Sequence, residues 1–136
     1  MFKQIAHVCL NVRDLEASFD FYENTLKLKK TFVFEKNGKV AGAYFEVGAG
    51  CYVEMFQKDF DGVTNTGITH FCLETDDIDD VVAWFDARNV EHTDKKLGSD
   101  QSWQIWVTDP DGNRIEVHEY TESSSQHTGR TALITW

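Results

Sequence analysis

The spacing of apolar residues in the first part of the chain predicts one helix among several strands. Apolar and polar residues alternate over 3–11, as in a strand with one buried face, whereas apolar residues recur every three or four positions over 14–26. Asp14 is expected to cap the helix in this second range. Alternation returns over 31–35 and 40–47, on both sides of an Asn-Gly pair that is typical of a hairpin turn. A glycine-rich turn then leads into the strand that carries Glu54. The predicted order is strand, helix and three strands.

The second part of the chain shows the same order of patterns. A strand is predicted over 67–75, and an amphipathic helix follows over 78–85, with Asp77 as its expected cap. A short strand is expected at 91–94. Two longer strands, 102–108 and 113–120, are joined by Asp-Pro-Asp-Gly, a turn whose proline fixes φ and whose glycine permits positive φ. The chain is therefore predicted to be an α+β protein of two tandem βαβββ modules.

The two modules also match residue by residue. Four residue types recur in register at an offset of 63 positions (70 − 7): Ile5, His7, Cys9 and Leu10 match Ile68, His70, Cys72 and Leu73. A repeat of about sixty residues is longer than solenoid periods, and two copies are fewer than such arrays need, so a duplicated module is the better interpretation. We therefore expect these parts in chain order: a first module at 2–57, a linker at 58–65, a second module at 66–120 and a C-terminal tail at 121–136.

Strand alternation predicts which residues share a face in each module. His7 and Cys9 should point to one side of their strand, while the residues between and beside them face the helix. The same alternation puts His70 and Cys72 together. With helices outside, the two modules are expected to form a curled mixed-sheet cup that has these residues on its inner face.

A histidine and a glutamate recur at nearly the same spacing in both modules. His7 and Glu54 lie 47 positions apart (54 − 7), and His70 and Glu116 lie 46 apart (116 − 70). Two imidazoles and two carboxylates suit a divalent ion such as Ni, Co, Fe, Mn or Zn. Each residue alone has structural uses, but the matched pair favours a metal site. An octahedral ion with four protein ligands would keep two positions for substrate oxygens, and a nearby carboxylate could move a proton.

Other side chains on the same strands are weaker candidates. His118 follows Glu116 by two positions and is a candidate for a pocket rim or a proton shuttle. Cys9 and Cys72 are expected to pack as small, buried, reduced thiols rather than to act as soft ligands or nucleophiles. Four aromatic residues are candidates for lining a pocket for an aromatic or apolar ligand, although strand aromatics more often form core: Phe34, Tyr44, Trp103 and Trp106.

Composition argues against several classes of protein. The 136 residues are 41% apolar and 13% aromatic, enough for one or two small packed units. No apolar run reaches the roughly 20 residues of a membrane span, and no secretory leader is evident. Three cysteines without CxxC spacing suit a reducing compartment, so we expect a cytoplasmic protein. The net charge of −10, with no Lys/Arg-rich segment, argues against nucleic acid and membrane surfaces as partners.

The two modules, the four candidate ligands and the stretch 106–116 resemble the vicinal oxygen chelate superfamily. In that stretch an Asp-Pro-Asp-Gly-Asn turn is followed by Ile-Glu, and the resemblance covers about residues 2–120. The superfamily includes glyoxalase I, extradiol dioxygenases, methylmalonyl-CoA epimerase, fosfomycin-resistance thiol transferases and metal-free bleomycin-binding proteins. The four-ligand pattern is most similar to that of bacterial glyoxalase I.

The similarity to glyoxalase I implies a metal-dependent enzyme that forms a homodimer. It implies one divalent ion per site, Ni, Zn, Co, Mn or Fe, held by His7, Glu54, His70 and Glu116. It also implies lyase or isomerase chemistry on a small oxygenated substrate, such as a hydroxy-carbonyl compound or a hemithioacetal, through an enediolate-like intermediate with Glu116 or Glu54 as the catalytic base. At two positions that help bind glutathione in that enzyme this chain has Asn11 and Lys58 instead of arginine and asparagine. Asn11 is therefore a candidate pocket residue, and the similarity leaves the use of glutathione open.

Two alternatives stay open within the superfamily. Extradiol dioxygenases resemble the subset His7, His70 and Glu116, which would hold Fe(II). A bleomycin-resistance-like protein would bind a small molecule without catalysis, here an aromatic ligand between Trp103 and Trp106. The sequence also leaves open whether the modules pair within one chain or between two chains.

Overall fold

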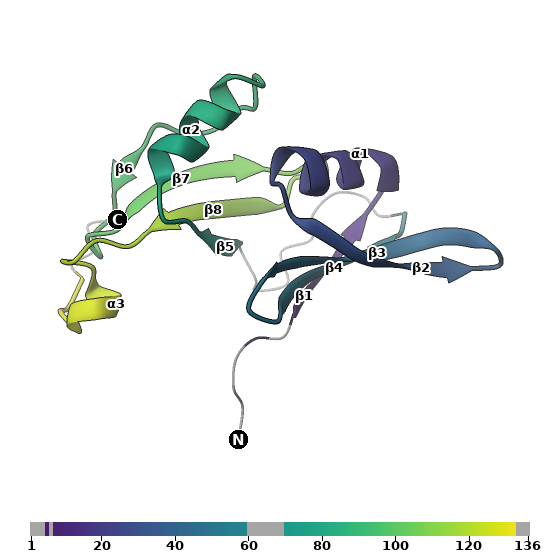
Figure 1. Cartoon of the computed structure of the whole chain (residues 1–136), viewed down its shortest axis with the longest axis horizontal. Coiled ribbons are helices and arrows are strands. Elements are labelled where there is room, and N and C mark those ends of the chain that lie inside the picture. Colours follow the sequence, from purple (N-terminus) through teal and green to yellow (C-terminus); the bar gives the residue numbers. More distant parts are fainter. Residues whose placement is uncertain (1–4, 6, 60–69, 133–136) are drawn as a thin grey trace. The chain divides into compact units, whose positions relative to one another are not determined.

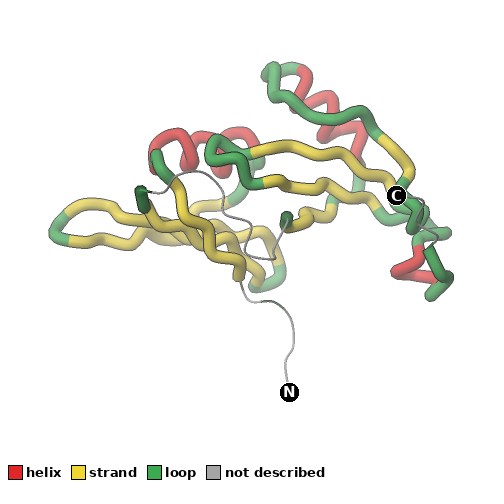
Figure 2. The backbone as a smooth tube through the Cα atoms, turned by 180° about the vertical axis from the view of Figure 1, so that it is seen from behind, coloured by secondary structure: helices red, strands yellow, loops and turns green. Residues whose placement is uncertain are grey.

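The chain folds into two units with the same topology. A computed structural model describes residues 5, 7–59 and 70–132. Each unit has a four-stranded mixed sheet, and the first unit also includes the turn Asp109–Asn113. In each unit a helix lies on one side of the sheet (Figures 1 and 2). Parts of the predicted elements lie outside the described residues: 3, 4 and 6 of the first strand, 60–65 of the linker, 67–69 of the fifth strand and 133–136 of the tail.

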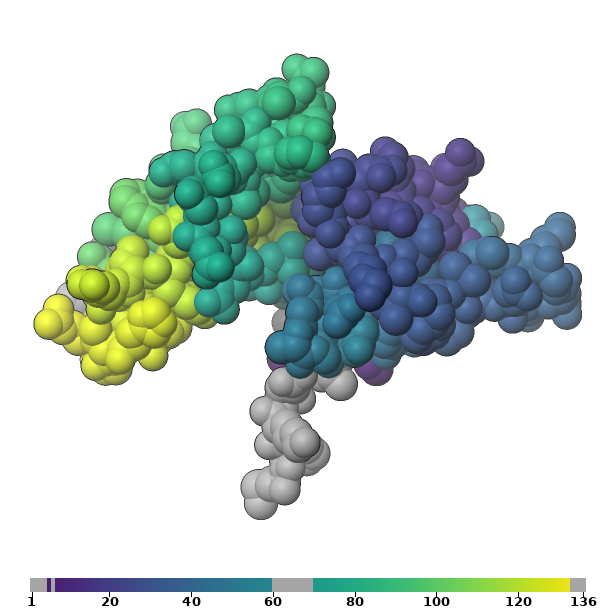
Figure 3. All heavy atoms as spheres, in the orientation of Figure 1, coloured from purple at the N-terminus to yellow at the C-terminus, as the bar shows by residue number. Residues whose placement is uncertain are grey.

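The first unit has the predicted order of strand, helix and three strands. Its elements are β1 (His7–Val12), α1 (Leu15–Phe19), η1 (Asp20–Thr25), β2 (Lys29–Lys36), β3 (Lys39–Gly48) and β4 (Cys51–Gln57). The strands are ordered β1-β4-β3-β2, with β1 parallel to β4 and the other neighbours antiparallel. The tip of the β2–β3 hairpin projects at one end of this unit, in blue in Figure 3.

The helix of the first unit begins at the predicted residue. Asp14 accepts hydrogen bonds from the backbone N–H groups of Glu16 (2.9 Å) and Ala17 (3.1 Å), which confirms it as the N-cap. The second half of the helix, η1, has the wider π-helical winding, in which the N–H of Leu26 donates to the carbonyl of Phe21 (2.9 Å). The sequence pattern predicts the helix but not this change of winding.

Alternate residues of the first sheet pack beneath this helix. Val53 and Met55 of β4 are buried, as are Phe45 of β3 and Tyr22 of η1. Glu54, which lies between the two buried residues of β4, is only half-buried and points to the other side. We call the side that packs on the helix the helix face, and the other side of each sheet the open face. The alternation predicted from the sequence therefore separates the core from the candidate ligands.

The turn Asp109–Asn113 is held in the first unit by two buried carboxylates. The Tyr22 hydroxyl donates to Asp109 (2.9 Å), and the Arg13 guanidinium donates to Asp111 (2.9 Å). Asp109 also accepts from the backbone N–H of Asn113 (2.8 Å). Burial and the neighbouring Asp109 carboxylate raise the pKa of Tyr22, so the hydroxyl remains a donor at neutral pH.

The second unit repeats the topology with shorter strands. Its elements are β5 (Phe71–Glu74), α2 (Ile78–Asp86), β6 (Lys96–Leu97), β7 (Trp103–Thr108), β8 (Arg114–Glu119) and α3 (Ser125–Thr128). The strands are ordered β5-β8-β7-β6, and β5 is parallel to β8. Asp77 accepts from the N–H of Asp80 (3.0 Å), which confirms it as the cap of α2. The helix face is closed by these buried residues: Ile78, Phe85, Ile105, Val107, Ile115 and Val117.

The short strand predicted at 91–94 is wrong in its position. The structure has β6 at Lys96–Leu97, and an isolated bridge to β7 is all that forms at the predicted place. Thr93 gives the reason. Its backbone N–H donates to the carbonyl of Trp106 (3.0 Å), but the N–H of Trp106 donates to the Thr93 hydroxyl (3.0 Å) rather than to a backbone carbonyl. The ladder is therefore interrupted and resumes at β6.

The C-terminal tail packs on the second unit as far as the described residues extend. Ser124 is buried, and the Ser102 hydroxyl donates to the Ser124 hydroxyl (2.8 Å). The Gln126 amide donates to the carboxylate of Asp100 (2.7 Å). These bonds fix the start of α3 against the loop that precedes β7.

All the described helices are short. The longest α-helix, α2, has nine residues, and none of the described helices combines the length and the apolar character that a bilayer crossing requires.

Replacing Tyr22 with Phe should lower the free energy of unfolding by about 1.5–3 kcal/mol, because a buried carboxylate would lose one of its donors. Chemical denaturation followed by circular dichroism measures this change. Tyr52→Phe is the matched control: Tyr52 is half-buried on the open face of the same sheet, and its loss of a hydroxyl should cost less than about 0.5 kcal/mol. Equal effects of the two variants would contradict the assigned role of the Tyr22–Asp109 bond.

Candidate metal centre

His7 and Glu54 meet on the open face of the first sheet. They lie on the parallel neighbours β1 and β4, and Nε2 of His7 is 3.7 Å from Oε2 of Glu54. On the other side of the ring, Nδ1 of His7 and the Tyr44 hydroxyl share a hydrogen bond of 2.8 Å. With the ring proton on Nδ1, the lone pair of Nε2 points toward a site next to Glu54. Tyr44, which pairs with Glu54 across β3 and β4, therefore orients the histidine.

Tyr44 stays protonated in this position. Desolvation and the nearby Glu54 carboxylate raise the pKa of Tyr44 above its usual value. The hydroxyl can therefore exchange a hydrogen bond with either tautomer of the histidine without carrying a charge. Hydrogen-bonding partners of this kind fix the orientation of metal-binding imidazoles in proteins.

His70 and Glu116 form an equivalent pair in the second unit. His70 directly precedes β5, Glu116 lies on the parallel neighbour β8, and Nε2 of His70 is 3.5 Å from Oε2 of Glu116. The His70 ring stands edge-on to Trp106, with ring centres 4.8 Å apart. Trp106 pairs with Glu116 just as Tyr44 pairs with Glu54, so the two units place an aromatic side chain at the same point beside each histidine.

The predicted ligands are therefore brought together in pairs, one pair in each unit. Two atoms that are each about 2.1 Å from one ion are roughly 3.0 Å apart at a right angle and roughly 3.4 Å apart in a tetrahedron. The observed separations of 3.7 and 3.5 Å require only a small closing movement. The donor types and the spacing within each pair fit a divalent cation.

The sequence matches a known family over most of its length. The family model described as Glyoxalase/Bleomycin resistance protein/Dioxygenase superfamily matches residues 4–117. The chain belongs to this superfamily. The fold class expected from the sequence, two tandem βαβββ modules with helices outside, is confirmed.

Individual relatives include enzymes that are named for different activities. A metallothiol transferase, FosB of Staphylococcus saprophyticus, is 28% identical over 125 residues, which cover 89% of this chain and 80% of that protein. A glyoxalase family protein from Enterococcus faecalis has the same fold with a TM-score of 0.75 and 23% identity, covering 87% of this chain and 98% of that one. A lactoylglutathione lyase from Agrobacterium tumefaciens has a TM-score of 0.66 and 23% identity, covering 85% and 92%. Such superfamily members are commonly metal-dependent enzymes.

The expected pocket between two tryptophans is wrong, whereas Asn11 lies where it was predicted. Trp103 and Trp106 lie three positions apart in one strand and therefore point to opposite faces: the Lys95 ammonium lies 4.7 Å from the centre of the Trp103 ring, whereas Trp106 contacts His70 on the open face. They cannot hold one ligand between them. Asn11 lies on the open face of β1, paired with Phe56, as the strand alternation requires.

The cysteines are free, as expected, but Cys9 and Cys72 are exposed rather than buried. Partial burial of each sulfur and a neighbouring carboxylate nevertheless raise both pKa values. The pKa of Cys9 rises to about 11 beside Glu54, and that of Cys72 to about 12 beside Glu116. Both thiols are therefore protonated at neutral pH, which argues against a nucleophilic role.

An aromatic surface on the first unit goes beyond the predicted pocket residues. The ring of Phe32 stacks on Tyr44 at 4.8 Å, and the ring of Phe34 lies 4.6 Å from that of Phe56. Gly42 makes room for this arrangement, since an added Cβ would collide with the backbone of the neighbouring strand and with Phe56. Aromatic residues at every second position of paired strands are the sequence signal that would have found this surface.

Substituting Phe for Tyr44 should weaken divalent-metal binding about 10- to 100-fold, because the imidazole of His7 would lose the partner that orients it. Titration calorimetry with zinc measures the dissociation constant. Tyr52→Phe again serves as the control: its ring centre lies 5.2 Å from that of Tyr44, but within the described part of the chain the hydroxyl that bonds His7 belongs to Tyr44 and not to Tyr52. Unchanged affinity in Tyr44→Phe would mean that His7 is not held as a ligand in this way.

Proposed function

We propose that this protein is a divalent-metal-dependent enzyme of glyoxalase type that acts on a small oxygenated substrate by lyase or isomerase chemistry. The observation that carries the proposal is the duplication of one histidine–glutamate pair, with separations of 3.7 and 3.5 Å, on equivalent strands of the two units. A four-ligand set results when the two pairs share one ion, within a chain or across a homodimer. The cytoplasm is the expected compartment.

The bound metal would polarise the oxygens of the substrate and stabilise negative charge on them. Proton transfer is assigned to Glu54 or Glu116, whose side chains are 17% and 13% exposed. Limited contact with water favours a carboxylate that exchanges a proton with the substrate rather than with solvent. Tyr44 and Trp106 would keep the two histidines in place during this exchange.

The aromatic surface beside His7 supports a substrate with an apolar portion. Phe32 is 46% exposed, so its ring presents area that a flat or aliphatic group could cover. Asn11 and Tyr44 add polar groups at the edge of the same surface. A hydroxy-carbonyl or hemithioacetal compound with a hydrophobic substituent fits this surface. Its oxygens could bind the metal while its apolar part covers the aromatic rings.

A metal-dependent transfer of a thiol is the second candidate. It is favoured by the similarity to a metallothiol transferase over 89% of this chain. The two activities differ in the bond that the enzyme makes. In the isomerase reaction the thiol has already added to the carbonyl compound, and only hydrogen moves within that adduct. In the transferase reaction the enzyme forms a new bond from the thiol sulfur to an electrophilic carbon, the bond from that carbon to oxygen breaks, and the oxygen takes up the thiol proton. The same metal ligands would serve either reaction.

Manganese(II) binding should disappear in the double variant His7→Ala/His70→Ala. Manganese(II) prefers nitrogen and oxygen ligands to thiolates, so it reports on the two histidine–glutamate pairs. Wild-type protein in manganese(II) at 100 times the dissociation constant should gain about 2.7 kcal/mol in free energy of unfolding, and the double variant should gain almost nothing. His92→Gln is the control, because His92 pairs with Asp86 (3.2 Å) outside both candidate pairs. Equal stabilisation of all three proteins would remove these histidines from the ligand set.

The reaction is tested with two substrate mixtures and metal-loaded protein. Methylglyoxal or phenylglyoxal with a thiol should give a thioester that absorbs in the ultraviolet. Of the two variants Glu54→Gln and Glu116→Gln, the one that removes the base should reduce kcat at least 100-fold with metal still bound. Fosfomycin with the same thiol, followed as loss of free thiol, tests the transferase. Turnover of the fosfomycin mixture without turnover of either glyoxal mixture would overturn the isomerase assignment. Turnover that a metal chelator does not reduce would overturn metal dependence.

A further inference from the structure

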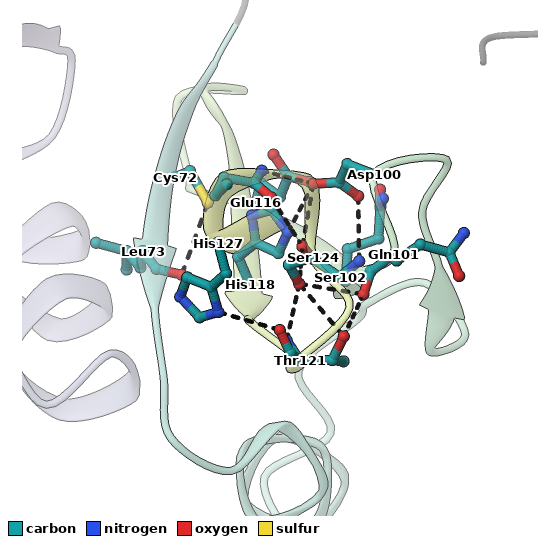
Figure 4. A network of polar contacts seen from close by, with 12 residues as sticks. Cys72, Leu73, Asp100, Gln101, Ser102, Glu116, His118, Thr121, Ser124 and His127 are labelled. Carbon is teal, nitrogen blue, oxygen red and sulfur yellow. Dashed lines mark hydrogen bonds and ion pairs between the residues drawn. The ribbon is translucent and has the colours of Figure 1, made fainter. Parts of the chain in front are cut away.

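Cys72, Glu116 and His118 cluster on the open face of the second unit. Cys72 pairs with Glu116 across the parallel strands β5 and β8, and His118 follows Glu116 by two positions on the same face. One ligand atom from each residue lies within 4.8 Å of the other two. Figure 4 shows the three side chains close together beside the loop that carries Asp100.

His118 has an unsatisfied polar atom in this cluster. Its side chain is 9% exposed, and its Nε2 is buried without a hydrogen-bond partner. A buried imidazole nitrogen in this state is uncommon, since buried polar atoms are almost always hydrogen-bonded. An unpartnered imidazole nitrogen beside a thiol and a carboxylate is the arrangement of a ligand site.

Asp100 places a second carboxylate beside the histidine. Its Oδ2 lies 3.5 Å from Nε2 of His118 without forming a hydrogen bond. The Gln126 amide (2.7 Å) and the Ser102 hydroxyl (3.1 Å) donate to the same carboxylate and hold it in position. Nε2 of His118 is therefore the atom that can bind a cation, and the Asp100 carboxylate adds negative charge beside it.

The repeat supplies an internal comparison. In the first unit Cys9 pairs with Glu54 as Cys72 pairs with Glu116, but Phe56 occupies the position that corresponds to His118 (54 + 2 and 116 + 2). The first unit thus lacks the third donor of the cluster. The grouping in the second unit is therefore more than a by-product of the duplicated strands.

From these contacts we propose that Cys72, Glu116 and His118 form a second chelating set, which binds a thiophilic divalent cation of the zinc class. A thiolate, an imidazole and a carboxylate make a three-ligand set that zinc and cobalt accept and that magnesium and calcium do not. On binding, the Cys72 sulfur forms a bond to the cation and its proton passes to solvent. Glu116 belongs to both sets, so this site competes with the His70–Glu116 pair for that carboxylate, while His7 and Glu54 are not required.

Cobalt(II) titration of the full-length protein tests the proposal, because thiolate coordination to cobalt gives a charge-transfer band in the near ultraviolet. Wild-type protein should show the band. Cys72→Ser should lose it, whereas the matched variant Cys9→Ser should keep it. His118→Phe, which introduces the residue found at the corresponding position of the first unit, should weaken cobalt binding at least tenfold, with folding checked by circular dichroism.

Three results would overturn the second site: a band that survives in Cys72→Ser, a band that is lost equally in folded Cys9→Ser, or no band in folded wild-type protein at saturating cobalt. The variant His7→Ala separates this proposal from the enzyme proposal. It should lose metal-dependent turnover and keep the charge-transfer band, because His7 lies outside the cluster. Loss of the band together with activity in that variant would contradict a separate site.

Discussion

The parallel pairing of the first and last strands of each module is the constraint on which the candidate site depends. β1 beside β4 brings His7 to Glu54 although 47 positions separate them in the chain (54 − 7), and β5 beside β8 does the same for His70 and Glu116. Alternation then assigns the intervening apolar residues to the helix face. A register shift of one residue in β4 would carry Glu54 beneath the helix, so core packing and placement of the donors are selected together.

The two units keep the same donors but differ in what surrounds them. Beside the histidine, the first unit has a hydroxyl that forms a hydrogen bond, and the second has an indole ring in edge contact. Two positions after the glutamate, the first unit has an apolar ring and the second a buried imidazole. The first open face is therefore mainly aromatic and the second mainly polar. The duplicated strands thus carry two kinds of surface around one arrangement of candidate metal donors.

Local rules explain why much of the fold could be predicted. Asp14 and Asp77 cap helices through their own side chains, and alternation assigns β4 and β8 correctly because it follows from strand geometry alone. The prediction of a strand at 91–94 was wrong because the Thr93 hydroxyl accepts the hydrogen bond of the Trp106 backbone N–H. Strand propensity does not account for such side-chain competition. Asp100 approaches His118 from a loop 18 positions earlier (118 − 100), and no local pattern marks that contact.

The turn Asp109–Asn113 has a consequence for the order in which the chain can fold. It connects β7 to β8 along the chain, yet its carboxylates accept the hydrogen bonds of Tyr22 and Arg13, 87 and 98 positions earlier. Contacts so distant in sequence close late, because the entropy of a long loop must be lost first. During synthesis the N-terminal sheet leaves the ribosome long before its tyrosine has an acceptor. Tyr22 and Arg13 therefore lack these two carboxylate acceptors until most of the second half of the chain has been synthesised.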